Sequence, residues 1–257
     1  MHGRMNLADS LAALTDLTHH GPVGTQWLAG ITDPAYPEAM YRAEVAFVDY
    51  EIGRLLDTLR RLLLESKVIL VLTADHGESL GEHAIYFDHI GLFRPQVHIP
   101  VIFFAPGLVP EGVRYDDLFS MVDLMPTVCD LLSIAPPPEV GGFSHARTVL
   151  EGHPGERDLV IVQHADHRAA TLRTATWSLQ RAWLPYSVVR VDTMLFDLTA
   201  DPDELEDKAS SDPRTYHMVS ELADWMNRAR DGEAPAATLD EATRRHLAAL
   251  GYLEEEP

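Results

Sequence analysis

Hydrophobic residues along the chain fall into stripes and runs that predict alternating helices and strands. From residue 37 to residue 64 apolar side chains recur at steps of three and four, as on one face of an amphipathic helix. The members of this stripe are Tyr41, Val45, Val48, Ile52, Leu55, Leu59 and Leu62. The next run, Val68–Leu72, is rich in β-branched residues and too short for a helix, so it predicts a fully buried strand of a parallel sheet. A helix followed by a strand is a unit of a layered α/β fold.

Later segments extend this pattern and then change it. Residues 99–104 predict a second buried strand, residues 121–132 predict a helix with Cys129 as a small core residue, and the prolines of residues 134–142 predict a linker. From residue 158 short segments alternate with polar turns, which predicts a small antiparallel sheet. Its expected strands are residues 159–162, 170–174, 177–180 and 194–198, and further helices are expected at residues 7–17, 215–230 and 239–250.

The change in pattern predicts two domains. Residues 1–150 are interpreted as part of an α/β domain, and residues 151–257 as a small α+β domain. With 257 residues, 46% of them hydrophobic, the chain is long enough for one large domain, or for one domain with a small appendage.

Charge and cysteine content exclude several classes of partner and site. Aspartate and glutamate outnumber lysine and arginine by 40 to 20, which gives a formal charge of −20. Such a chain repels nucleic acid and anionic membranes, so neither is expected as a partner. The single cysteine, Cys129, excludes an internal disulfide and a multi-cysteine metal site. No apolar signal core or membrane-length run is present, so the chain as given is expected to be cytoplasmic; a signal upstream would make it periplasmic or secreted.

The candidate chemistry lies in the polar turn Asp75-His76-Gly77-Glu78, directly after the first predicted strand. In open α/β sheets the loops beyond the carboxyl ends of strands form the ligand crevice. If the backbone turns at Gly77, the carboxylate of Asp75 and the imidazole of His76 can converge on one divalent cation. The alternative is a plain turn in which Asp75 accepts hydrogen bonds from backbone amides and His76 faces solvent.

Six segments, in a shared order, resemble the C-terminal half of a sulfatase of the alkaline-phosphatase-like superfamily. Because they span roughly 210 residues, their order is far more specific than any single motif. The segments are residues 41–56, 72–83, 87–101, 122–128, 195–204 and 247–253. The resemblance implies part of a three-layer α/β/α core, followed by a small C-terminal antiparallel sheet plus helix.

The resemblance also implies an activity and roles for individual residues. Sulfatases hydrolyse sulfate esters of small molecules or glycans, and relatives act on phosphate or phosphonate esters. They use a divalent cation, commonly Ca²⁺ and in some branches Mn²⁺ or Zn²⁺. Asp75 and His76 match metal ligands, and His89 matches a residue that contacts the sulfate or the leaving oxygen, unless it is a solvated loop histidine. Glu78 and His83 are candidate supports for these ligands; the alternatives are an exposed Glu78 and a structural His83.

Other parts of the family's site have no match. The paired aspartates and the Cys/Ser-x-Pro-x-Arg motif that yields formylglycine are not encoded, since Cys129 is followed by Asp-Leu-Leu-Ser. Two ligands cannot hold Ca²⁺ tightly, because this ion takes about six to eight oxygens. Three hypotheses follow: an incomplete sulfatase, one half of a two-chain enzyme that pairs with a complementary N-terminal half, or an inactive remnant that acts by binding. In each case the isolated chain is expected to be inactive.

Overall fold

A computed structural model describes residues 32–164, 169–182 and 193–231 of the chain. The helices predicted at residues 7–17 and 239–250 lie outside these ranges. The chain divides into two units: one is Pro34–Val219, and the other combines Met1–Asp33 with Ser220–Pro257. All elements discussed below lie in the first unit, except that helix α6 continues into the second. The predicted division at residue 150 stays a prediction.

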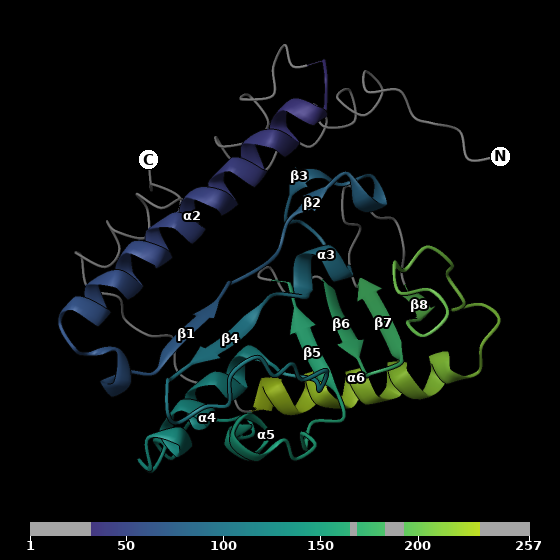
Figure 1. The fold of residues 1–257 in the computed structure, drawn as a ribbon. Helices are drawn as coiled ribbons and strands as arrows, with labels where there is room; N and C mark the ends of the chain where they lie inside the picture. The colour runs from purple at the N-terminus through teal and green to yellow at the C-terminus, as the bar shows by residue number, and fades with distance from the viewer. Residues whose placement is uncertain (1–31, 165–168, 183–192, 232–257) are drawn as a thin grey trace, which may run out of the picture. The chain divides into compact units, whose positions relative to one another are not determined.

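The long helix α2, Ala35–Arg61, confirms the prediction from the apolar stripe (Figure 1). Helix-favouring residues fill most of it, and Arg42 donates to Glu38 one turn earlier, as i,i+4 pairs do on helix surfaces. Its apolar residues are nevertheless accessible, because Val45 and Val48 are 55% and 51% exposed. The helix therefore carries apolar surface that the described residues leave uncovered.

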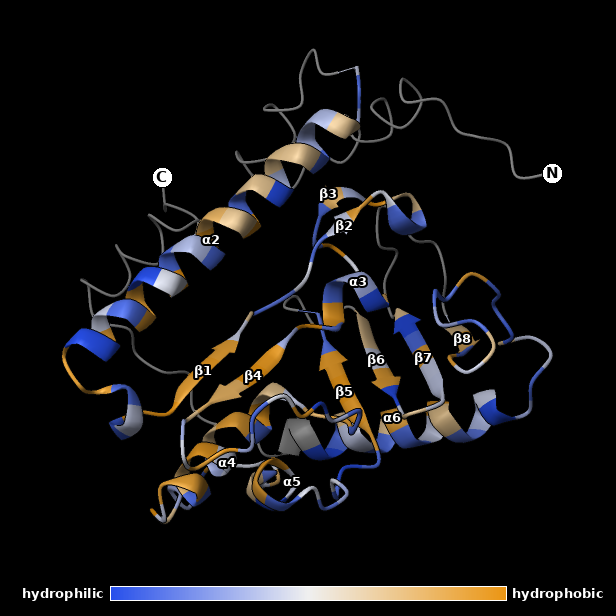
Figure 2. Ribbon diagram, viewed as in Figure 1, coloured by the Kyte–Doolittle hydropathy of each residue, from blue (hydrophilic) through white to orange (hydrophobic). Residues whose placement is uncertain are grey.

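The two apolar runs form a pair of strands, β1 (Leu70–Thr73) and β4 (Val101–Phe104), both hydrophobic in Figure 2. They pair antiparallel, with Val71 opposite Phe103. The predictions of a fully buried parallel strand at residues 68–72 and of a second fully buried strand at 99–104 are wrong for the described residues, because β1 is only half-buried and Ile102 is exposed. An apolar run does not encode strand direction. Here the chain returns through a hairpin and a short helix rather than through a long crossover helix.

A small hairpin and a short helix occupy the stretch between β1 and β4, and the sequence pattern predicts neither. Strands β2 (Ser79–Leu80) and β3 (Tyr86–Asp88) pair antiparallel, and helix α3 spans Arg94–Val97. Phe93, just before α3, packs with Ile85 and Phe196 in one buried cluster. This cluster fixes the hairpin and α3 against strand β8 (Thr193–Asp197) of the second sheet.

The second sheet confirms the prediction of a small antiparallel sheet. Its strands are β5 (Val160–Gln163), β6 (Ala169–Arg173), β7 (Trp177–Ala182) and β8, in the order β5-β6-β7-β8 (Figure 1). Leu172, Leu179 and Leu195 are directly opposite one another on three neighbouring strands and are fully buried. These cross-strand contacts form the centre of its core. Helix α6, Arg214–Asp231, confirms the helix expected at residues 215–230.

The segment between the two sheets contains the short helix η4 (Met121–Asp123), α4 (Leu124–Leu131) and α5 (Ala146–Glu151). The first two confirm the helix expected at residues 121–132. Leu131 of α4 packs with Ala146 and Val149 of α5, and Phe103 of β4 contacts this cluster. The segment is thereby joined to the first strand pair.

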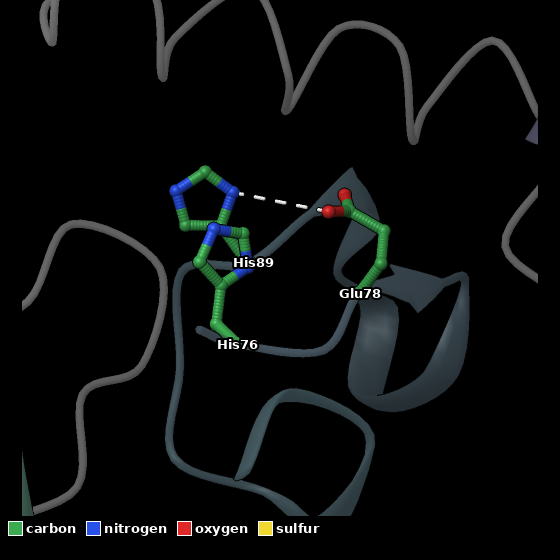
Figure 3. Close-up of side chains that lie close together, drawn as sticks. All are labelled: His76, Glu78 and His89. Carbon is green, nitrogen blue, oxygen red and sulfur yellow. Dashed lines mark ion pairs between the residues drawn. The ribbon is translucent and has the colours of Figure 1, made fainter. Parts of the chain in front are cut away.

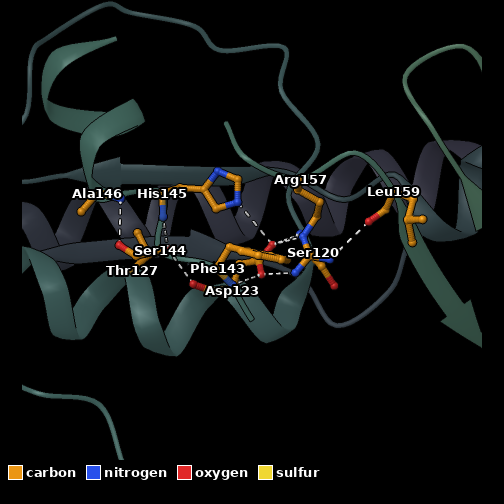
Figure 4. A network of polar contacts seen from close by, with 9 residues as sticks. All are labelled: Ser120, Asp123, Thr127, Phe143, Ser144, His145, Ala146, Arg157 and Leu159. Atoms are coloured by element: carbon orange, nitrogen blue, oxygen red, sulfur yellow. Dashed lines mark hydrogen bonds and ion pairs between the residues drawn. The ribbon is translucent and has the colours of Figure 1, made fainter. Parts of the chain in front are cut away.

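A buried polar network centred on Asp123 holds this segment together (Figure 4). The Asp123 carboxylate accepts backbone N–H groups of Ser120 and Phe143, both at 2.8 Å, and two hydrogen bonds from the Arg157 guanidinium. His145 Nε2 lies 3.3 Å from Asp123 Oδ2. Burial alone would raise the pKa of Asp123, but these neighbours outweigh it and hold the pKa well below its usual range.

No helix among the described residues is long and apolar enough to cross a membrane.

Candidate active site

The candidate site begins where β1 ends. Asp75 and His76 follow this strand and are exposed, with 69% and 43% of their side chains accessible. Asp75 Oδ1 accepts the backbone N–H of His76 at 3.0 Å, so this carboxylate does bond a backbone amide of its own turn. The same carboxylate keeps Oδ2 3.7 Å from His76 Nε2. The turn and the convergence of the two side chains are therefore compatible.

One hydrogen bond sets the role of each His76 ring nitrogen. His76 Nδ1 lies 2.9 Å from the carbonyl oxygen of Gly77, and a carbonyl can only accept. Nδ1 therefore carries a proton, which leaves Nε2 as the ring nitrogen that can bind a cation. A backbone carbonyl on the second nitrogen is the usual way in which proteins orient a metal-binding histidine.

The β2–β3 hairpin brings Glu78 and His89 together. Ser79 pairs with Asp88, so the residues just before β2 and just after β3 lie beside each other. His89 Nδ1 is 3.8 Å from Glu78 Oε2, and the His89 ring stacks on His76 with centroids 4.1 Å apart (Figure 3). The ligand atoms of His76, Glu78 and His89 all lie within 4.8 Å of one another.

The charges of the site follow from these contacts. The Glu78 carboxylate raises the pKa of His89, against the smaller opposing effect of burial, and so favours its cationic form. Burial acts to raise the pKa of Asp75, but the backbone amide of His76 and the nearby His76 and His89 rings lower it overall. The site thus places a carboxylate that stays ionised beside an imidazole that readily holds a proton.

Gly77 is required at this turn because of space. A Cβ added there would lie 1.9 Å from the carbonyl oxygen of Pro95, a backbone atom that cannot move aside without moving α3. The Gly77 N–H also donates to the carbonyl of Gln96 at 2.7 Å. The loop therefore lies directly against α3.

Replacing Gly77 by alanine is expected to destabilise the chain by about 1–3 kcal/mol, as overpacking of a tight contact does. The control is Gly53→Ala on the exposed surface of α2, where a Cβ meets nothing within 4 Å. That change should stabilise by about 0.5–1 kcal/mol, because alanine favours a helix interior. Urea unfolding of both variants checks the pair, and equal effects at the two glycines would contradict the packing argument.

The positions of two further residues relative to the site were not predicted from the sequence. His83, expected beside the ligands, has its ring stacked on Phe93 with centroids 3.7 Å apart and is outside the group formed by His76, Glu78 and His89. Gln96 has no sequence signal as a site residue, but its hydrogen bonds to Gly77 and Ser79 hold the loop. Only the packing of α3 against the loop, which a pattern of polar residues does not show, could have pointed to it.

The donor atoms fit a divalent cation. Protein ligands lie about 2.0–2.6 Å from such ions, so two of them on one ion are separated by at most roughly 5 Å. His76 Nε2 and Asp75 Oδ2, at 3.7 Å, meet this limit. One imidazole and one carboxylate suit Mn²⁺ or Zn²⁺ at least as well as Ca²⁺, which prefers oxygen.

Comparison with solved structures identifies the fold. A structure solved in complex with its substrate D-glucosamine-2-N,6-O-disulfate superposes with a TM-score of 0.63 at 24% identity, over 74% of this chain and 40% of the other. The phosphonate monoester hydrolase of Agrobacterium radiobacter gives 0.62 at 23% identity, over 77% and 42%. The fold is thus that of alkaline-phosphatase-like hydrolases, as the sequence predicts.

The family follows from sequence. The family described as "Sulfatase" matches residues 20–134, and "N-sulphoglucosamine sulphohydrolase, C-terminal" matches residues 81–232. Arylsulfatase K of Mus musculus is 29% identical over 202 residues, which are 74% of this chain and 35% of that protein. The chain belongs to the sulfatase family, and it spans about a third of the length of the curated relatives it matches.

Proposed function

We propose that the loop after β1 contributes the metal ligands Asp75 and His76 to a sulfuric ester hydrolase, and that His89, directly after β3, contacts the substrate. The observation that carries this proposal is the convergence of the three side chains. His76 lies 3.7 Å from the Asp75 carboxylate, and its ring stacks on that of His89. A bound divalent cation would neutralise the ester's oxygens and stabilise charge that grows in the transition state.

Each residue has a defined task. Asp75 stays ionised and, with Nε2 of His76, orients toward a common point at the end of β1. Glu78 Oε2 lies 3.8 Å from His89 Nδ1 and favours the cationic ring, whose other nitrogen can contact the anionic ester or protonate the departing alkoxide. Glu78 therefore acts on His89, rather than on His76 as the sequence suggests.

A sulfated glycan is the substrate class that we propose. One similar structure holds a disulfated glucosamine, and another relative is a delta 4,5-hexuronate-2-O-sulfatase. The similarity to phosphonate monoester hydrolases keeps a phosphonate ester as the second candidate. With a formal charge of −20, the chain needs a local cation and a protonated His89 to bind either anion.

We propose that activity also needs the paired aspartates and the formylglycine, supplied by a complementary sulfatase N-terminal half. The exposed apolar residues of α2, among them Val45, Phe47 and Val48, support a packing partner of this kind. The chain alone, supplied with Ca²⁺, Mn²⁺ or Zn²⁺, is therefore expected to show no arylsulfatase turnover. The same chain co-expressed with such a half should hydrolyse a sulfated disaccharide, and turnover by the chain alone would refute the incomplete site.

His89→Ala is expected to lower kcat of the assembled enzyme by about 100-fold, within the usual range for a lost general acid. The side chain is more than half exposed, so the free energy of unfolding should change by less than about 0.5 kcal/mol. Steady-state kinetics and urea unfolding measure the two quantities. A loss of stability that matches the loss of rate would assign His89 a structural role instead.

A further inference from the structure

The loop that carries the proposed ligands is held at two points by a single residue, Gln96 of α3. The Gly77 N–H donates to the Gln96 carbonyl at 2.7 Å, and the Gln96 side-chain Nε2 donates to Ser79 Oγ at 2.6 Å. Gln96 and Ser79 are both buried. The two contacts lie on either side of Glu78, so its backbone cannot move independently of α3.

These contacts extend to both histidines. Gly77 makes two of these contacts. Its N–H donates to the Gln96 carbonyl, and its own carbonyl accepts a hydrogen bond from His76 Nδ1. Ser79, the second contact, pairs with Asp88, which directly precedes His89. Moving Gln96 would therefore change the position of His76, Glu78 and His89 together.

Helix α3 is itself anchored to the second sheet. The buried Glu204 accepts the backbone N–H of Arg94 at 2.6 Å through Oε2, and through Oε1 it accepts Arg173 of β6 at 2.7 Å. Charge-assisted hydrogen bonds of this length are among the strongest in proteins. The site loop is thus hydrogen-bonded to α3, and α3 is hydrogen-bonded through Glu204 to the β5–β8 sheet.

We propose that Gln96 is a positioning residue, which holds the loop of residues 76–79 in the geometry that the metal and the ester require. The inference deepens the proposed function and rests on it for the identity of the site. Hydrogen bonds that fix the orientation of metal-binding side chains contribute strongly to the affinity for the metal.

If Gln96 served only to stabilise the fold, replacing it would lower the melting temperature of the whole chain. Gln96 Oε1 is buried and accepts no hydrogen bond from any described residue, so the bond to Ser79 is the one that the side chain makes among these residues. Replacing Gln96 by methionine, which has a similar shape, removes this bond and leaves no unpaired polar atom at position 96, while Ser79 Oγ keeps its contact with the Glu82 carbonyl. The fold is therefore expected to tolerate Gln96→Met, whereas the loop is not.

The experiment compares the full chain with Gln96→Met, Ser79→Ala and the double variant by hydrogen exchange of residues 75–80, thermal melting and Mn²⁺ binding. Each single change should speed exchange of the loop amides about 10-fold and weaken Mn²⁺ binding about 10-fold. Gln96→Met should leave the melting temperature nearly unchanged, whereas Ser79→Ala should lower it, because the buried Gln96 Nε2 loses its acceptor. In loop exchange and Mn²⁺ binding the double variant should behave like either single one. The control is Gln180→Met, since Gln180 is also buried and its Nε2 has no partner among described residues. That change should leave loop exchange unaltered.

Unchanged loop exchange in both single variants would overturn the proposal, as would additive effects in the double variant. Should Gln96→Met fail to fold, Ser79→Ala alone decides, because Ser79 is the other end of the same bond. Asp75 and His76 are only two ligands, so the chain alone is expected to bind Mn²⁺ weakly. If the chain assembled with the complementary half binds no Mn²⁺ either, the proposed function fails, while the exchange data on the chain alone still accept or reject the positioning role of Gln96.

Discussion

Replacing His76 by alanine should lower turnover of the assembled enzyme by at least about 100-fold, because losing even a residue that only supports a metal ligand costs about 10–100-fold. The ring offers Nε2 to the cation while the Gly77 carbonyl fixes Nδ1. Asp75→Asn should act in the same direction, since it removes the charge but keeps the shape. Steady-state kinetics with a sulfated disaccharide and Mn²⁺ binding to the chain measure both variants.

The matched control is His153→Ala, because His153 is about as exposed as His76 and, among the described residues, contacts Glu151 and Arg147 on the surface, away from the site. It should leave turnover and Mn²⁺ binding unchanged. Full activity in His76→Ala would remove this residue from the metal site. Equal losses in the two histidine variants would indicate a general effect of removing a surface imidazole.

Asp123→Ala should be the most destabilising single change in the described part of the chain, by about 3–5 kcal/mol. It leaves the buried Arg157 guanidinium without its carboxylate and removes the acceptor for two backbone amides. An exposed carboxylate provides the control: Asp116→Ala, at a side chain 87% exposed, should change stability by less than about 0.5 kcal/mol. Urea unfolding decides, and a loss below about 1 kcal/mol at Asp123 would refute the network's role.

The same network predicts how stability depends on pH. The folded pKa of Asp123 lies below the ordinary value of about 3.9, so its contribution is complete above that value. As pH falls from there toward the lower folded pKa, the carboxylate takes up a proton and the contribution is lost. The difference in free energy of unfolding between the unaltered chain and Asp123→Ala should therefore shrink on acidification below about pH 4. A constant difference down to pH 2 would contradict this.

The sequence predicted elements whose pattern is local. A few neighbouring residues encode each of these patterns: the apolar period of α2, the short segments between polar turns that form β5 to β8, and the turn after residue 74. Strand direction was not predictable, because an apolar run such as that around Val71 has the same sequence pattern whether the neighbouring strand is parallel or antiparallel. The exposure of the α2 stripe was not predictable either, since periodicity shows that a face is apolar but not what covers it.

The candidate site divides in the same way. Asp75 and His76 are adjacent in sequence, and the family's motif pointed to them directly. The approach of Glu78 to His89 depends on the pairing of Ser79 with Asp88, and the support by Gln96 depends on where α3 packs. Such contacts arise from tertiary structure, so residue types and spacing alone did not reveal them.

The most direct test of the central claim is electron paramagnetic resonance of Mn²⁺ bound to the chain with ¹⁵N-labelled histidine. A cation held at the end of β1 by Asp75 and His76 should show coupling to a directly bound imidazole nitrogen, and His76→Ala should abolish it. Coupling that persists in His76→Ala, or bound Mn²⁺ without any imidazole coupling in the unaltered chain, would contradict the account.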